Sequence, residues 1–308
     1  MDGARSTGSP LVPGARLPQL GSGPPPGPGR GPRRAALAVV AGVVVVALLA
    51  VIGVLLVRRG PADGHGDQAG QAAPGQGQDR VLWQPPVPAG RSLLTNELAY
   101  RHPDAAGAHL SPDWIATSGS LFSDGGALWS GPVDGGSPDA ASRSATGSAV
   151  LRAVSVPQDF GDVRVTLGLD VANLTTTERT GERAYDGVHL FLRYTSPDSL
   201  YAVSLCRRDG TTAIKRKLPG ATSTGGIYTT LAQVRMPCPI GHWQDYAVSV
   251  RDEAGGVRLT LAAGGRTVVS VLDDGQGGGA PLRGPGRVGL RGDNASFHVR
   301  GLTVHSAG

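Results

Sequence analysis

Basic, aromatic and hydroxyl side chains gather on one face of three stretches between residues 188 and 218. In each stretch apolar and polar residues alternate, so an extended strand would carry aliphatic side chains on one face and polar ones on the other. With Tyr228 on the following stretch, the candidate ligand-binding residues are His189, Phe191, Arg193, Arg208, Lys215 and Lys217. Imidazole, guanidinium and ammonium groups donate hydrogen bonds to hydroxyl and carboxylate oxygens. The pattern predicts a surface for a polyhydroxylated or acidic ligand; the alternative is an ordinary solvated sheet face.

Short strands are the elements that must position these residues. From about Val81 onward, apolar-alternating runs are separated by Gly, Asp and Pro, and almost no stretch keeps the 3.6-residue period of a helix. Asn96–His109 is ambiguous and leaves room for a short helix. Many short strands with regular turn signals predict an antiparallel β-sandwich or barrel. The clearest runs are Val163–Leu169, Val188–Tyr194, Tyr201–Leu205, Thr212–Leu218, Tyr246–Val250, Val257–Leu261, Thr267–Leu272, Arg287–Leu290 and Phe297–Val304.

The apolar run Ala35–Val57 predicts a transmembrane helix. Its 23 residues carry no charge, no Pro and no hydrogen-bonding side chain. At ~1.5 Å per residue it would span ~35 Å, enough to cross a hydrocarbon core of ~30 Å. Because Arg-Arg follows directly, without a small-residue cleavage site, we expect an uncleaved signal anchor that contacts the lipid bilayer.

The segments that flank this run are rich in Pro, Gly and polar residues. Residues 1–34 predict a disordered cytoplasmic tail, and residues 58–80 predict a flexible linker. The N-terminal side of the run carries the larger number of Arg residues, which places the N-terminus in the cytoplasm and the domain at 81–308 outside the cell. We therefore expect a single-pass protein of the cell membrane.

The charge distribution argues against a nucleic-acid partner. Residues 1–59 carry seven Arg and one acidic residue, whereas residues 60–308 carry 22 basic and 23 acidic residues. The basic excess thus lies around the apolar run, and the large C-terminal part has no phosphate-tracking surface. Arg outnumbers Lys and Gly is abundant, which is typical of a high-GC bacterial genome.

Cys206 and Cys238 are the two cysteines of the chain. Both would lie outside the membrane, where disulfides persist, so we expect them to form a bridge. The bridge would close a loop that contains the stretch with Lys215 and Lys217.

Several runs resemble the concanavalin A-like lectin/glucanase superfamily, and within it the jelly-roll domains of the laminin-G-like and 3-keto-disaccharide hydrolase kind. The matching features are Gly187-Val188 with Arg193, Tyr201–Leu205, Trp243, Asp273 and Gly286–Leu290. The resemblance covers roughly residues 112–305 and implies an antiparallel jelly-roll β-sandwich as the core of the domain.

The resemblance leaves the activity open. Glucanases of the superfamily carry a Glu-X-Asp-X-(X)-Glu strand, and none of Glu97, Glu178, Glu182 and Glu253 stands in such an array. We therefore favour a protein without catalysis, while a glycan hydrolase or a polysaccharide lyase remains an alternative. The lyase would use basic and phenolic residues such as His189, Lys215 and Tyr228, whereas Tyr194 falls on the core face of its run.

Laminin-G-like domains hold Ca²⁺ at strand ends, and the resemblance makes Asp186, Asp293 and Asn294 candidate ligands for structural calcium. No other cofactor is expected. Together these features predict a membrane-anchored cell-surface protein whose outer domain binds carbohydrate or a cell-envelope polymer. A structural, protein-binding module is a third hypothesis.

Overall fold

The computed structural model describes residues 79–131, 149–176, 181–220 and 226–307. The predicted tail at 1–34, the apolar run at 35–57 and all of the linker at 58–80 except its last two residues lie outside this part of the chain. Among the described residues, no helix combines the length and apolar character that a membrane crossing requires.

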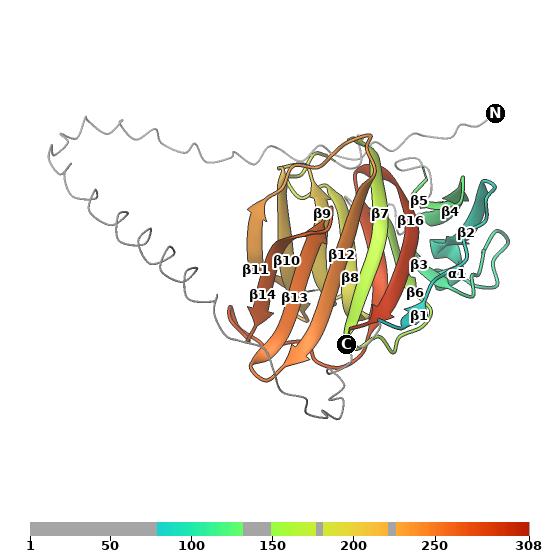
Figure 1. Ribbon diagram of the computed structural model, residues 1–308. Coiled ribbons are helices and arrows are strands. Elements are labelled where there is room, and N and C mark those ends of the chain that lie inside the picture. The colour runs from blue at the N-terminus through green and yellow to red at the C-terminus, as the bar shows by residue number, and fades with distance from the viewer. Residues whose placement is uncertain (1–78, 132–148, 177–180, 221–225, 308) are drawn as a thin grey trace, which may run out of the picture. The chain divides into compact units, whose positions relative to one another are not determined.

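Two antiparallel sheets stack face to face, as the all-β prediction requires (Figure 1). Sheet A has nine strands and sheet B has seven. In order, sheet A consists of β14 (Arg266–Asp273), β13 (Gly256–Ala263), β12 (Gln244–Glu253), β7 (Val163–Leu174), β16 (Ala295–Ser306), β5 (Ala127–Trp129), β4 (Ser120–Asp124) and β2 (Ser92–Asn96), with β1 (Val81–Trp83) paired to β16. Sheet B consists of β11 (Ile227–Arg235), β10 (Thr211–Leu218), β9 (Ser199–Arg207), β8 (Gly187–Ser196), β15 (Arg287–Asp293), β6 (Ala149–Ser155) and β3 (Trp114–Ser118).

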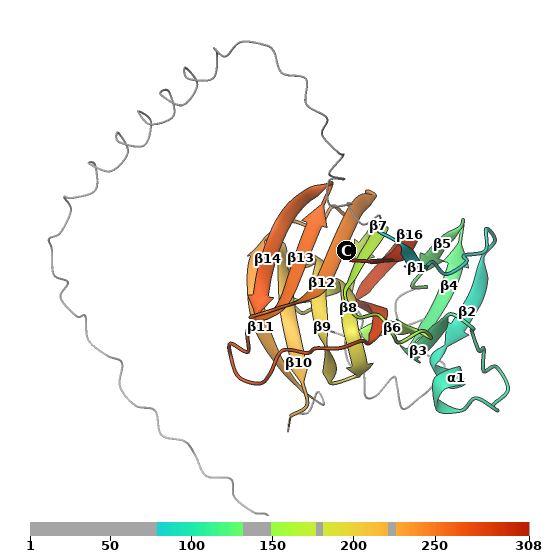
Figure 2. The same ribbon diagram turned by 60° about the horizontal axis from the view of Figure 1, so that its bottom comes forward.

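All nine runs predicted from alternation lie within strands of the structure. A short helix, α1 (Glu97–Arg101), does occur in the ambiguous stretch, where the Asn96 side chain accepts a hydrogen bond from the Ala99 amide at 3.1 Å. Figure 2 shows α1 beside β2 and β3, at the opposite end of the molecule from β11 and β14.

The hydrophobic core lies between the sheets. Alternate residues of each strand point into it, as with Leu190 and Val203 from sheet B and Val248 and Leu259 from sheet A, all of which are fully buried. The opposite parity of sheet B faces outward, and we call this surface the outer face of sheet B.

A bulge in β8 breaks the alternation at Arg193. This residue has φ 47°, and the register of β8 against β9 shifts between Leu192 and Ser196. Gly286 makes room for the bulge, because a Cβ there would lie 2.5 Å from the carbonyl carbon of Arg193. The prediction that Tyr194 faces the core is therefore wrong: its ring packs against Phe191 on the outward side, with 6.0 Å between the ring centroids.

The disulfide between Cys206 and Cys238 is confirmed, with 4.8 Å between the Cα atoms. It joins β9 to the segment before β12 and encloses β10 and β11 in a loop with a sequence separation of 32. On the chain-entropy model a loop of this length contributes about 3–4 kcal/mol by constraining the unfolded chain.

Reduction should therefore lower the melting temperature, by roughly 6–16 °C for a domain of this size. Differential scanning calorimetry with and without reductant measures the shift. The double variant Cys206→Ala/Cys238→Ala is the control, because its melting temperature should not respond to reductant. Equal melting of the oxidised and reduced wild type would show that the bridge adds nothing.

Candidate functional site

The outer face of sheet B has an apolar floor. Phe191, Leu200 and Ala202 form a cluster with Tyr194 and Val154, and each of these side chains is buried although it points away from the main core. Ile115 of β3 packs against the cluster. The five buried side chains are between 1% and 7% exposed, so they form a second small core on this side of the sheet.

Basic side chains and one phenol stand around this floor. Lys217 of β10 places its Nζ 5.1 Å from the ring centroid of Tyr228 on β11, and the same Nζ donates to the Pro197 carbonyl at 2.8 Å. Arg152 of β6 donates through Nε to the Thr117 hydroxyl at 2.7 Å. The Tyr228 side chain is exposed, so its ring remains available for stacking.

Cations from neighbouring strands lie near one another, since Arg152 of β6 is directly opposite Arg291 of β15. Burial lowers the pKa of Lys217, and the positive charges of Arg291 and Arg152 lower it further. Burial and the charge of Arg291 likewise lower the pKa of Arg152. For Lys215 the causes are burial and Arg207. An anion bound among these groups would offset their mutual repulsion.

The pKa of Tyr228 is raised, chiefly because neighbouring groups desolvate the phenol, although the residue is 37% exposed and Arg291 opposes the shift. The phenol therefore stays protonated at neutral pH. This gives no support to a lyase in which the Tyr228 oxygen abstracts a proton.

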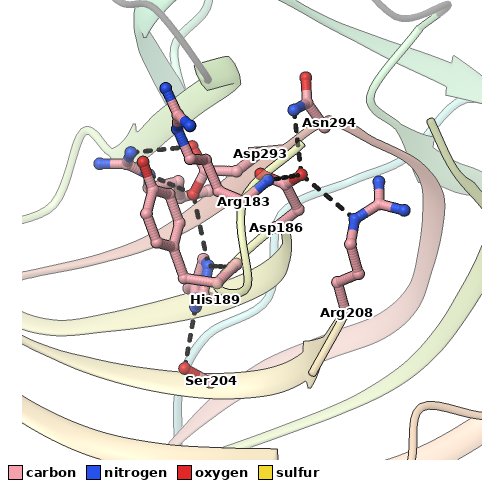
Figure 3. A network of polar contacts seen from close by, with 9 residues as sticks. Arg183, Asp186, His189, Ser204, Arg208, Asp293 and Asn294 are labelled. Carbon is pink, nitrogen blue, oxygen red and sulfur yellow. Dashed lines mark hydrogen bonds and ion pairs between the residues drawn. The ribbon is translucent and has the colours of Figure 1, made fainter. Parts of the chain in front are cut away.

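A polar network lies beside the cations, where β8, β9 and β15 meet (Figure 3). The Asp293 carboxylate accepts from Nε and from a terminal nitrogen of Arg291, both at 2.8 Å. His189 Nε2 lies 3.3 Å from Asp293 Oδ2, and His189 Nδ1 lies 3.0 Å from the Ser204 hydroxyl. Burial alone would raise the pKa of Asp293, but Arg291 and the hydrogen bond from His189 outweigh it and hold that pKa below its usual value.

Asp186 and Asn294, two of the predicted calcium ligands, are fully buried in the same network. Asp186 Oδ2 accepts from the Asn294 amide at 3.1 Å and from Arg208 Nε at 3.3 Å. Among the residues that the structure describes, Asp186 Oδ1 and Asn294 Oδ1 have no hydrogen-bond partner, but Figure 3 shows the Asn294 oxygen pointing away from Asp186.

These contacts do not fit a calcium ion, because arginines already occupy both carboxylates and the free oxygens do not converge. Within the described residues, no group of three or more His, Cys, Asp or Glu side chains could hold a metal ion. Calcium stays a prediction that the geometry does not favour.

The structure brings most, but not all, of the predicted ligand-binding residues together. His189, Phe191, Lys215, Lys217 and Tyr228 lie on the outer face of sheet B or along its edge strand β11. The other two, Arg193 and Arg208, lie elsewhere.

Arg193 is turned away by the bulge in β8, and only 3% of its surface is exposed. Its guanidinium binds Asp252 at 2.7 Å and Asp162 at 2.8 Å, and it ties β8 to the turns of sheet A. Arg208 follows the end of β9 and binds Asp186 and the Thr175 carbonyl. Both arginines therefore stabilise the sandwich and do not line the outer face.

Arg152 and Arg291 are site residues that were not predicted. The signal was present, because each alternates with core residues: Arg152 lies between Leu151 and Ala153, and Arg291 follows Leu290. What the sequence did not show is that β15 pairs with β8 and that β6 pairs with β15.

A second surface with ligand-sized space crosses the outer side of sheet A. This shallow groove of about 550 Å³ has a floor of small residues, Gly168, Ala247 and Ala262, between Arg164 and Arg300. Arg300 stacks on Trp243, with 4.3 Å from its guanidinium carbon to the ring centroid. The Asp245 carboxylate also lines this groove.

No protein-family model and no curated protein matches this chain. Solved structures similar in shape include an endo-1,3-β-glucanase from Streptomyces sioyaensis, with 14% identity, a TM-score of 0.40 and coverage of 72% of this chain and 99% of that one. The acidic lectin of winged bean matches with 13% identity and a TM-score of 0.41, covering 64% of this chain and 93% of the lectin. A Bacillus subtilis protein of unknown function with a galectin-like fold matches with 13% identity and a TM-score of 0.38, covering 74% and 96%. At such identities and TM-scores the likeness carries no argument about the family or the ligand of this chain.

Replacing Asp293 by Asn should destabilise the domain, because it leaves Arg291 without its buried counter-charge. Loss of one partner of a buried pair costs about 3–5 kcal/mol, and the residual 19% exposure of the Arg291 side chain places the expected value toward the lower end. Urea unfolding at neutral pH, with the exposed Asp104→Asn as the control, measures the difference.

The same variant should change the acid response. The pKa of Asp293 is lowered in the folded state, so its contribution is present above the unfolded pKa near 4 and is lost as pH falls through the folded value. The wild type should therefore lose stability more steeply below about pH 4 than Asp293→Asn does. If the free energy of unfolding fell equally with pH in the two proteins, the ion pair between Asp293 and Arg291 would be contradicted.

Proposed function

We propose that the outer face of sheet B binds an acidic carbohydrate, such as a uronate-containing polymer of the cell envelope. The observation that carries the proposal is that Arg152 of β6 lies directly opposite Arg291 of β15, and the charges of both arginines lower the pKa of Lys217 on β10. A protein gains nothing in stability by crowding like charges. Such crowding is expected where an anionic ligand is to be bound.

The chemistry of the face suits a sugar acid. Arginine presents a planar fork that binds a carboxylate through two hydrogen bonds, and lysine adds a point charge. The ring of Tyr228, which is 37% exposed, offers apolar surface to the C–H face of a pyranose ring. A neutral glycan would use this ring but would leave the charges of Arg152 and Lys217 without a bound anion.

The location of the protein is part of the proposal. The apolar run at 35–57 would anchor the chain in the cell membrane with its N-terminus in the cytoplasm, and residues 58–80 would tether the sandwich outside. The confirmed disulfide supports an oxidising compartment for the domain. An envelope polymer would then lie within reach of the outer face of sheet B.

Titration calorimetry with polygalacturonate and with neutral dextran tests the proposal. We expect binding to polygalacturonate alone, and a loss of affinity of about tenfold or more in Arg152→Ala, because a hydrogen bond to a charged group contributes about 1.5–3 kcal/mol. The exposed Arg266 on sheet A gives the matched control, Arg266→Ala, which should bind as the wild type does. Equal affinity for both polymers, or an equal loss in both variants, would contradict the proposal.

The binding should also weaken as pH rises. The pKa values of Lys215 and Lys217 lie below their ordinary value of 10.5, and the cationic forms bind the anion. Affinity should be retained at neutral pH and fall as pH rises through these lowered values. It should also fall with salt, because partly exposed ion pairs are screened. Affinity independent of both pH and salt would argue for a neutral ligand.

A further inference from the structure

Three buried side chains on the outer face of sheet B stand in the order of a nucleophile, a base and a carboxylate. The Ser204 hydroxyl lies 3.0 Å from His189 Nδ1, and His189 Nε2 lies 3.3 Å from Asp293 Oδ2 (Figure 3). We propose that Ser204 is a nucleophile activated by His189 and Asp293, and that this face hydrolyses carboxylic esters. The proposal goes beyond carbohydrate binding and does not depend on it.

The hydrogen bonds assign the protons of His189. Its Nε2 faces two acceptors, the Tyr185 carbonyl at 3.2 Å and Asp293 Oδ2 at 3.3 Å, so Nε2 carries the proton. In the neutral tautomer Nδ1 has a free lone pair and accepts the hydrogen of the Ser204 hydroxyl. In this tautomer the imidazole can act as a general base toward Ser204, with Asp293 Oδ2 3.3 Å from its Nε2.

Regular strands hold the three residues in register. His189 on β8 lies directly opposite Ser204 on β9 and opposite Arg291 on β15. Asp293 comes two residues after Arg291, and the fork of Arg291 fixes both carboxylate oxygens. The exposed fractions are 3% for Ser204, 8% for His189 and 1% for Asp293, so neighbouring side chains hold the group in place. Rigid placement of this kind is what a nucleophilic site requires.

The proposed reaction needs no co-reactant other than water. Ser204 Oγ forms a bond to the ester carbonyl carbon while its proton passes to His189 Nδ1, and Asp293 stabilises the imidazolium. The C–O bond to the alcohol then breaks, and His189 returns the proton to the leaving alcohol. Water attacks the acyl-serine with His189 again as the base, releasing the carboxylic acid and restoring Ser204.

Positive charge near Ser204 indicates the substrate class. Lys215 lies on the neighbouring strand opposite Ala202, and Arg207 follows Ser204 on β9. Arg207 forms an ion pair with Asp209 at 2.5 Å. Lys215 would attract an ester that carries a negative charge.

Reaction of the full chain with a fluorophosphonate probe, followed by peptide mass spectrometry, tests the assignment. We expect an adduct at Ser204 and hydrolysis of p-nitrophenyl acetate. Both should fall by at least about a hundredfold in Ser204→Ala and in His189→Gln, since a general base contributes about 10²–10⁴. The exposed Ser270 gives the control variant Ser270→Ala, which should react as the wild type does.

His189→Gln keeps a hydrogen-bonding side chain at this position but cannot take up a proton, so it separates catalysis from folding. A folded wild type without an adduct at Ser204, or equal labelling of the wild type and His189→Gln, would overturn the proposal and leave the three residues as a structural network. Binding of polygalacturonate by Ser204→Ala, measured beside its loss of ester hydrolysis, would show that the two proposals are independent of each other.

Discussion

The buried carboxylate of Asp293 is the charge around which the outer face of sheet B is organised. An ionised carboxylate that is 1% exposed is stable only when cations and donors surround it. Arg291 supplies two hydrogen bonds and His189 supplies a third contact. Asp293 holds Arg291 at the position from which its positive charge lowers the pKa values of Arg152 and Lys217. The same carboxylate orients His189 toward Ser204. The cationic surface and the polar network therefore depend on one buried acid.

A second buried charge pair ties the two sheets together at the other end of the sandwich. Arg216 of β10 is fully buried and binds Asp273 of β14, and the Tyr201 hydroxyl donates to the same carboxylate at 2.6 Å. Tyr201 in turn accepts from the Leu282 amide. These bonds cross from sheet B to sheet A and hold β10 at the position from which Lys215 and Lys217 point outward. The inner face of sheet B thus supports the arrangement on its outer face.

Much of this architecture could be predicted from alternation, because one buried face forces a period of two on a strand. That argument placed His189, Phe191, Lys215 and Lys217 correctly, and the two cysteines predicted the disulfide. It failed at Arg193 and Tyr194, where a positive φ and the approach of Gly286 reverse the faces. It also could not find Arg152 and Arg291, since the pairing of β6, β15 and β8 joins residues far apart in the chain. The sequence also did not show which charged side chains form pairs. Alternation placed Arg208 on the ligand face, but this arginine is bound to Asp186.

A crystal structure of the protein with a uronate oligosaccharide tests the central claim most directly. The account predicts that sugar carboxylates lie within hydrogen-bond distance of Arg152 or Lys217, with a pyranose ring against Tyr228. A saccharide bound instead in the groove of sheet A, beside Arg164 and Arg300, would contradict it.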